Sequence, residues 1–423
     1  MTAYDSYMSS TTSKAGIVSF EEARRIVEEH AARVLVRTNQ AAIETVDLLD
    51  GRGRVLAEEL IADRDFPPFA RAARDGYAVR AADLERVPAR LDVIAEIRAG
   101  DWPDATGVVV GSGQAASIMT GAPLPAGADA VVMVEYTVAL GKSVEIQRRV
   151  RSGENFVPRG AEARATQVLV ECGLRLDHSL IAIAASIGKS RVAVFRKPRV
   201  AVLSTGDEVV EIGVVPGAAQ IRNSNAYSLA AQVEEAGGEA VRLAIAPDEK
   251  TRLRELIEEG LKCDLLLLTG GVSMGKYDLV EQVLDELKAE FYFTGAKIQP
   301  GKPVVFGCCG AKYFLGLPGN PVSTMVTLRL FAEPIIAALA GARCRPLIFL
   351  KGRLKAEVRI KTGLTRFLPG VVSGEFENAE VELAAWQGSG DIAALARSNC
   401  YLVIPPDRER IEVGEWISVL VVE

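Results

Sequence analysis

Two acidic residues that follow apolar runs, Asp207 and Asp278, are the side chains in this sequence best suited to chemistry. The first run covers residues 200–203, and the second covers residues 265–268. Two carboxylates within about 4–6 Å of each other repel unless one is protonated or a cation lies between them. Mg²⁺ commonly binds one or two carboxylates together with substrate phosphates. The pair therefore predicts a magnesium site, although Asp207 could instead fix its own turn and Asp278 could cap a helix.

Glycine-rich loops beside these carboxylates could bind phosphate through their backbone. Glycine lets the backbone approach a phosphate closely, and the start of a helix offers unpaired N–H groups. Residues 269–278 form such a loop before a helical pattern, and residues 318–321 (Pro-Gly-Asn-Pro) lead into another. Lys302 adds a mobile positive charge. The alternatives are a plain tight turn for the glycine loop and a solvated loop position for Lys302.

The elements around these loops alternate between strand and helix. Strands are expected over residues 200–203, 241–245, 265–268, 304–306 and 313–315, and helices from 225 to 237, from 248 to 261, from 278 onward and from 321 to 340. Such alternation predicts a doubly wound sheet. The loops over residues 204–208, 269–278 and 317–323 would then lie at one sheet edge, where such folds bind ligands.

Three regions that flank this α/β section have other sequence patterns. Ser19 and Glu22 form a capping box for an N-terminal helix, and a short helix is expected over residues 50–60. Residues 61–158 predict a small all-β domain, while residues 160–187 look helical and should pack with the N-terminal helices. Turns every eight to twelve residues after the last helix predict a small barrel or sandwich. The expected domains are 16–60 with 159–197, then 61–158, 198–341 and 342–423.

Composition and missing motifs exclude several functions. The chain has 423 residues, a net charge of −6 and 6% aromatic residues, which argues against nucleic-acid binding. We expect no membrane span and a cytoplasmic location, because no apolar run reaches bilayer length and no signal peptide is evident. The six cysteines lack CxxC spacing, and two histidines are too few for a histidine zinc site. Rossmann, Walker A and nucleophile-elbow motifs are absent as well.

Seven motifs in order resemble the MoeA family, the molybdopterin molybdenumtransferases, which include the C-terminal domain of gephyrin. The resemblance covers residues 18–422. The motifs are PPF…DGYAVR (67–80), IMTGAPLPAGADAVVM (118–133), PRVAVLSTGDE (198–208), QIRNSN (220–225), TGGVSMGKYD (269–278), PGKP (300–303) and LPGNPVS (317–323).

The resemblance implies a fold and a reaction. The fold would combine an elongated N-terminal helical domain, an inserted β domain, a central doubly wound α/β domain similar to MogA and MoaB, and a C-terminal β-barrel. Two copies would form a homodimer with its cleft between the β insertion of one subunit and the α/β and barrel domains of the other. The reaction would convert adenylated molybdopterin (molybdopterin-AMP) and molybdate into molybdenum cofactor and AMP, with Mg²⁺. Suggested protein partners are a MogA-like adenylyltransferase and molybdoenzyme apoproteins.

The resemblance also implies roles for particular residues. Asp207, Asp278 and Glu208 would serve the metal, and Asp75 and Thr120 would arrive from the partner subunit. The catalytic set is Asp207, Asp278, Asp75, Thr120 and Lys302. The residues expected to bind the pterin–nucleotide are Thr205, Gly206, Gly270, Gly271, Ser273, Gly275, Pro318, Gly319, Asn320, Ser323, Ser389 and Arg222. Molybdate would be drawn in by backbone N–H groups and by Arg159 or Arg222.

Three departures from the family pattern leave alternatives open. Residues 70–74 read Ala-Arg-Ala-Ala-Arg where the family usually has Asp-Asn-Ser-Ala-Met, Glu162 stands where Asp is usual, and Gln299 replaces a frequent lysine. A paralogue that prefers tungstate is therefore one alternative. A MogA-like adenylyltransferase and a gephyrin-like dimeric scaffold that binds a partner peptide are the others.

Overall fold

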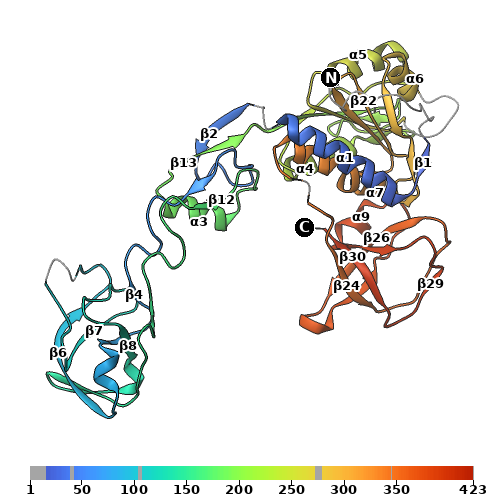
Figure 1. Ribbon diagram of the computed structural model, residues 1–423. Coiled ribbons are helices and arrows are strands. Elements are labelled where there is room, and N and C mark those ends of the chain that lie inside the picture. Colours follow the sequence, from blue (N-terminus) through green and yellow to red (C-terminus); the bar gives the residue numbers. More distant parts are fainter. Residues whose placement is uncertain (1–15, 39–41, 103–106, 272–278, 344, 423) are drawn as a thin grey trace, which may run out of the picture.

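The computed structural model describes residues 16–38, 42–102, 107–271, 279–343 and 345–422. The chain is elongated, with a small β domain at one end, a narrow middle region, and an α/β domain beside a barrel at the other end (Figure 1). The three main sheets follow one another along the chain as predicted: a β region, a central α/β region and a C-terminal barrel.

The α/β domain is built on a mixed sheet in the order β17-β14-β18-β23-β22-β19. Strands β17, β14, β18 and β23 are parallel, and β22 and β19 add antiparallel pairings. Leu265–Thr269 (β18) lies between β14 and β23, and all five of its residues are buried. This explains its unbroken apolar run, because both faces of the strand are covered by helices. The strands are β14 (Arg199–Ser204), β17 (Glu239–Arg242), β18, β19 (Glu290–Phe293), β22 (Val305–Cys309) and β23 (Lys312–Leu317).

Helices cover both faces of this sheet, as predicted. One core contains residues of α1 (Phe20–Thr38), α4 (Ser224–Glu235), α7 (Pro321–Thr327) and α8 (Glu333–Leu339). The other contains residues of α5 (Lys250–Gly260) and α6 (Leu279–Glu286). At the start of α1 the Ser19 hydroxyl accepts a 3.1 Å hydrogen bond from the Glu22 N–H, which confirms the predicted cap. The cap of α5 is Glu249 rather than Asp248.

The last helical stretch of this domain, Pro321–Leu339, runs through α7, a π-helical turn (residues 328–332) and α8. By length and composition it could cross a membrane, contrary to the expectation that no apolar run reaches that length, but 72% of its apolar window is buried inside the protein. Val322, Phe331 and Ile335 are among its fully buried residues. The stretch is therefore a core helix whose hydrophobicity serves packing.

Residues 61–158 are largely β, as predicted. Six strands form one sheet in the order β8-β5-β7-β6-β10-β9. They are β5 (Gly76–Val79), β6 (Ala89–Ile97), β7 (Gln114–Ile118), β8 (Ala130–Met133), β9 (Thr137–Leu140) and β10 (Ser143–Ile146). Buried residues from both faces of the sheet form two small cores, around Ile118 and around Val144. Nearby, β4 (Arg71–Ala72) pairs with β11 (Phe156–Val157).

The middle region corrects the prediction of a helical N-terminal domain. Residues 50–60 form turns, two isolated bridges and the first residue of a strand instead of a helix. Among the described residues of 42–60 and 160–197 the only helix is α3 (His178–Ser186). Strand pairs join the two segments: β2 (Ile43–Asp47) with β13 (Arg191–Phe195), and β3 (Leu60–Ile61) with β12 (Val168–Val170). The two segments do share a small core, but the N-terminal helix α1 packs on the α/β domain and not, as predicted, with residues 160–187. The exact domain limits stay a prediction.

The C-terminal region is a closed barrel. Strands β26, β27, β24, β30 and β28 pair in a ring, because β28 bonds both β30 and β26. Their bounds are β24 (Phe349–Leu354), β26 (Thr365–Ser373), β27 (Glu380–Leu383), β28 (Cys400–Ile404) and β30 (Trp416–Val421). The short helix α9 (Ile392–Ala396) and strand β21 (Ile298–Gln299), which pairs with β26, connect the barrel to the α/β domain.

Candidate active site

Three loops meet at one edge of the central sheet. The last residues of β14, β18 and β23 are in register, with Ser204 opposite Thr269 and Thr269 opposite Leu317. Since the three strands are parallel, the loops that follow them leave the sheet side by side. The predicted convergence is confirmed for the described residues of these loops, which in the second loop end at Gly271.

The glycine turn after β18 lies directly against the loop after β14. Gly270 and Gly271 have φ values of +90° and +59°, which favour glycine. A Cβ atom on Gly270 would lie 2.6 Å from the Thr205 carbonyl oxygen, and one on Gly271 would lie 2.9 Å from Thr205 Oγ1. The Thr205 N–H also donates to the Thr269 carbonyl at 3.0 Å. Close packing against Thr205 therefore already requires glycine at both positions, whether or not a ligand also approaches them.

Two buried polar atoms at this edge lack a hydrogen-bond partner within the described structure. They are Thr205 Oγ1, on a residue that is only 4% exposed, and Asn225 Oδ1. An unsatisfied buried polar atom costs roughly 1–3 kcal/mol. Such atoms are few in native proteins, and here two lie where three loops converge.

The predicted acidic residues of the first loop are exposed. One oxygen of Asp207 accepts a 3.0 Å hydrogen bond from the Asp248 N–H, which holds the carboxylate near the start of α5. The Glu208 carboxylate folds over Gly206, where a Cβ would lie 2.4 Å from Oε2. The other predicted residues of the glycine loop, Asp278, Ser273 and Gly275, lie outside the described residues.

The start of α7 is joined to the barrel. Asn320 Nδ2 donates to Ser389 Oγ at 2.8 Å, and the Val322 N–H donates to the Ser389 carbonyl at 3.0 Å. Gly319 packs against Gly270, since a Cβ on Gly319 would lie 3.6 Å from the Gly270 Cα. Pro318, Gly319, Asn320 and Ser389 are therefore brought to the same edge as the glycine turn.

Lys302 and Ser323 lie on adjoining segments. Gly301 has φ +106°, and a Cβ there would lie 2.4 Å from Thr327 Cγ2 and 3.6 Å from the Ser323 carbonyl oxygen. The segment carrying Lys302 thus packs on α7, with the Lys302 side chain exposed and Ser323 buried. Arg222 is turned to a different contact, because its Nε donates to the carbonyl oxygens of Ile212 and Val214 at 3.1 and 3.2 Å.

Asp75 and Thr120 form a separate corner. Asp75 Oδ1 accepts hydrogen bonds from the Thr120 N–H at 2.6 Å and from Thr120 Oγ1 at 2.9 Å. These two bonds, the backbone bond first, lower the pKa of the Asp75 carboxyl. The corner belongs to the sheet of β5, β7 and β8, which lies at the opposite end of the molecule from the α/β domain (Figure 1). One chain therefore does not bring all the predicted residues together.

The segments that depart from the family pattern contact one another. Arg71 in β4 lies opposite Val157 in β11, and its Nη2 is 2.8 Å from Glu162 Oε1. Arg159 Nε is 2.7 Å from Asp65 Oδ2. Hydrogen bonds from the Ala165 N–H and then from Arg159 lower the pKa of the Asp65 carboxyl. The unusual arginine and glutamate thus form an ion pair between the two segments.

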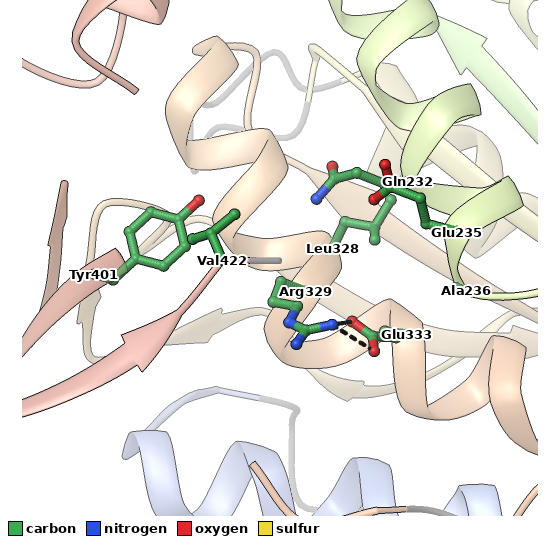
Figure 2. Close-up of a pocket in the computed structure, with 8 residues that line it drawn as sticks. All are labelled: Gln232, Glu235, Ala236, Leu328, Arg329, Glu333, Tyr401 and Val422. Atoms are coloured by element: carbon green, nitrogen blue, oxygen red, sulfur yellow. Dashed lines mark hydrogen bonds and ion pairs between the residues drawn. The ribbon is translucent and has the colours of Figure 1, made fainter. Parts of the chain in front are cut away.

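A pocket of about 410 Å³ lies elsewhere, between α4, the helical stretch after α7 and the barrel (Figure 2). Arg329 points toward Glu333 in it, with both Glu333 oxygens 2.7 Å from Arg329 Nη1. The residues that line it are Gln232, Glu235, Ala236, Leu328, Arg329, Glu333, Tyr401 and Val422. None of them is a predicted site residue.

The sequence reasoning missed Asn223 and Asn225 at the start of α4. Asn223 accepts a 2.8 Å hydrogen bond from Ser204 Oγ, and Asn225 bonds Thr269 Oγ1 at 2.9 Å and the Gly319 carbonyl at 2.8 Å. Within the motif over residues 220–225, the sequence analysis assigns a role to Arg222 and none to the asparagines. Two polar asparagines at the start of a helix that packs on the sheet were the available signal.

The fold and the site define a multidomain protein whose central α/β sheet brings polar and glycine-rich loops together at one edge. Three family models match the chain: "MoeA N-terminal region (domain I and II)" over residues 18–188, "Probable molybdopterin binding domain" over residues 201–338, and "MoeA C-terminal region (domain IV)" over residues 351–422. Together they span most of the sequence.

Relatives match along nearly the whole chain. It is 36% identical over 394 residues to the molybdopterin molybdenumtransferase of Nostoc sp., covering 90% of this chain and 89% of the relative. The Bacillus subtilis molybdopterin molybdenumtransferase is 33% identical, with 94% of each chain covered. The molybdopterin biosynthesis protein MoeA of Pyrococcus horikoshii OT3 superposes with a TM-score of 0.77 at 28% identity, covering 96% of this chain and all of that one. The chain belongs to the MoeA family of molybdopterin molybdenumtransferases.

Proposed function

We propose that this chain is an enzyme of molybdenum cofactor biosynthesis that inserts molybdenum, supplied as molybdate, into molybdopterin. The register of Ser204, Thr269 and Leu317 carries the proposal, because it gathers three polar loops at one sheet edge. Relatives named for this activity match over about nine-tenths of the chain.

The substrate in this proposal is molybdopterin-AMP, whose pyrophosphate would lie along the glycine turn. Backbone N–H groups around Gly270 and Gly271 would donate to its oxygens, and the dipole at the start of α7 would add to the attraction, since the Val322 N–H is already bonded to the Ser389 carbonyl. A helix N-terminus favours an anion by roughly 0.3–1 kcal/mol at an exposed site. Lys302 would add a positive charge that reaches from the adjoining segment. Cleavage of the phosphoanhydride would depend mainly on positioning and on neutralisation of charge.

The carboxylates of the first loop fit a magnesium ion. Within the described residues no three His, Cys, Asp or Glu side chains group closely enough to enclose a metal. Mg²⁺, however, is usually held by one or two carboxylates and by substrate phosphates. Asp207 and Glu208 are exposed at this edge and Asp207 keeps one oxygen free of the Asp248 bond, so these two residues, with Asp278, would hold the ion. Bound there, Mg²⁺ would neutralise charge on the phosphates.

The second half of the site would come from another copy of the chain. Asp75 and Thr120 lie in the β domain, remote from the sheet edge of their own chain. In a homodimer, the β domain of one subunit would cover the loops of the other and bring Asp75 and Thr120 close to molybdate. Arg159 from the β-domain side, or Arg222 from the α/β side, would supply positive charge for molybdate; for Arg222 this requires its side chain to leave the Ile212 and Val214 carbonyls.

The test is to incubate the purified protein with molybdopterin-AMP, Mg²⁺ and molybdate and to follow AMP and cofactor formation. Wild-type protein should release AMP in a molybdate-dependent reaction. Asp207→Ala and Asp278→Ala should abolish turnover while size-exclusion chromatography shows an unchanged dimer. Full activity in both variants would contradict the metal assignment. Consumption of ATP with free molybdopterin would favour an adenylyltransferase, and faster reaction with tungstate would favour the tungsten-preferring alternative.

A further inference from the structure

The first turn of α4 lies where the three strand-end loops meet. Asn225 Nδ2 donates to Thr269 Oγ1 at 2.9 Å and to the Gly319 carbonyl at 2.8 Å, and it lies 3.5 Å from Thr324 Oγ1. These acceptors belong to the end of β18, the turn before α7, and α7 itself. One carboxamide therefore connects segments that are 44 and 94 residues away in the sequence.

Neighbouring hydrogen bonds extend this connection. Thr269 Oγ1 donates in turn to the Pro318 carbonyl at 3.3 Å, which again joins β18 to the turn before α7. Two residues before Asn225, the buried Asn223 accepts from Ser204 Oγ at 2.8 Å, at the end of β14. The start of α4 thus bonds the ends of β14 and β18 and the turn that follows β23.

The position of the glycine turn at Gly270 depends on these hydrogen bonds. Gly270 directly follows Thr269, and Gly319 packs against the Gly270 Cα. Because Asn225 bonds both Thr269 and Gly319, it fixes the separation of the turn that follows β18 and the turn that precedes α7. Both turns are thus held by the same carboxamide group, whose nitrogen donates to each of them.

We propose that Asn225 is a positioning residue for the substrate: it holds the turn at Gly270 and the turn at Gly319 at the spacing that one phosphate-bearing ligand requires. The inference rests on the proposed function, since it assigns these turns to molybdopterin-AMP. Asn225 acts through the turns and makes no contact with the reacting atoms.

Gln232 provides a matched control on the same helix. Like Asn225 it is half-buried, donates its carboxamide to α7 (to the Met325 carbonyl at 3.2 Å), and has a buried oxygen without a partner in the described structure. It lines the pocket of Figure 2, two helical turns further along α4, and its hydrogen bond goes to Met325 in place of the strand-end turns. A purely structural role should make the two residues equivalent.

The experiment measures kcat and KM for molybdopterin-AMP in wild-type protein, Asn225→Ala, Asn225→Asp and Gln232→Ala, together with thermal stability. Loss of one or two hydrogen bonds that align the turns should raise KM about tenfold for both Asn225 variants. We expect kcat to stay within about threefold, because the turns hold ground state and transition state alike. Gln232→Ala should lose similar stability and keep KM within about twofold.

The outcomes separate the two proposals. An inactive wild-type protein would contradict the proposed function. An active wild-type protein with an unchanged KM in Asn225→Asp, or an equal KM rise in Gln232→Ala, would overturn the positioning role. If Asn225→Ala does not fold, Thr269→Val removes the acceptor while it keeps the shape of the side chain. Thr269→Val should raise KM by a similar factor, and the double variant Asn225→Asp/Thr269→Val should add little to either change; additive changes would also overturn the proposal.

Discussion

The sheet edge of the α/β domain and the Asp75–Thr120 corner of the β domain differ in how completely their polar atoms are hydrogen-bonded. At the corner, one carboxylate oxygen of Asp75 already accepts two hydrogen bonds from Thr120. At the sheet edge, Thr205 Oγ1 and Asn225 Oδ1 have no partner within the described structure. Both regions join segments that are distant in the sequence, 45 residues apart at the corner and 44 or 94 at the edge, but only the edge keeps buried oxygens without a partner among the described residues.

Gly270→Ala should cause the largest loss of activity, and it changes the sheet edge while leaving the Asp75–Thr120 corner intact. The new Cβ would lie 2.6 Å from the Thr205 carbonyl oxygen, at a φ of +90° that side chains rarely adopt. The turn must move, and a displacement of about 1 Å in a binding loop can cost on the order of 100-fold in rate. We therefore expect kcat/KM for molybdopterin-AMP to fall by about that factor. Gly213→Ala is the control, since nothing lies within 4 Å of its Cβ position.

Ser389→Ala should have a smaller effect at the same edge. It removes the 2.8 Å hydrogen bond from Asn320 but leaves the backbone bond from Val322 to the Ser389 carbonyl, so the barrel should stay docked. One lost hydrogen bond predicts a fall in kcat/KM of about three- to tenfold. Ser398→Ala serves as the comparison, because that hydroxyl follows α9 and donates to the Ala394 carbonyl of the same helix at 2.8 Å. Equal losses in both variants would show that Ser389 has no particular place in the site.

Thr120→Val should have the smallest effect, and it tests the corner alone. The backbone bond from residue 120 to Asp75 remains, so the pKa of Asp75 should rise only part of the way toward its ordinary value. A carboxyl with a lowered pKa in the folded state stabilises the fold above its unfolded pKa, which is about 3.9, and loses that contribution as pH falls through the folded pKa. The variant should therefore lose part of this stabilisation above about pH 4, and its difference in stability from wild type should shrink as the pH falls below that value. NMR titration of Asp75 measures the shift, and an unchanged pKa would mean that the hydroxyl bond is unimportant.

The sheet and its loops could be predicted because their signals are local. Leu265–Thr269 is buried on both faces, and such a strand must be an apolar run. The glycines that follow it are needed for the turn itself, so they mark the loop in the sequence. The sequence motifs then located the same residues through the family resemblance.

The middle region could not be predicted in this way. Val55, Leu56 and Leu60 have a spacing that suits a helix, but they are buried in turns and short bridges against residues 173–195. Gly53, with φ +75°, ends any helix there. Asn225 was missed for a related reason, because its acceptors are 44 and 94 residues away and only the folded chain brings them together.

The central claim is that two regions held apart in one chain act together at one site in a dimer. Its most direct test mixes Asp75→Ala with Asp207→Ala, each inactive alone, under conditions that exchange subunits. If the site combines Asp75 of one subunit with Asp207 of the other, half of the dimers are mixed and each has one intact site, so AMP release should recover to about a quarter of the wild-type rate. Mixed dimers that form, as seen by mass spectrometry of tagged subunits, but release no AMP would contradict the account.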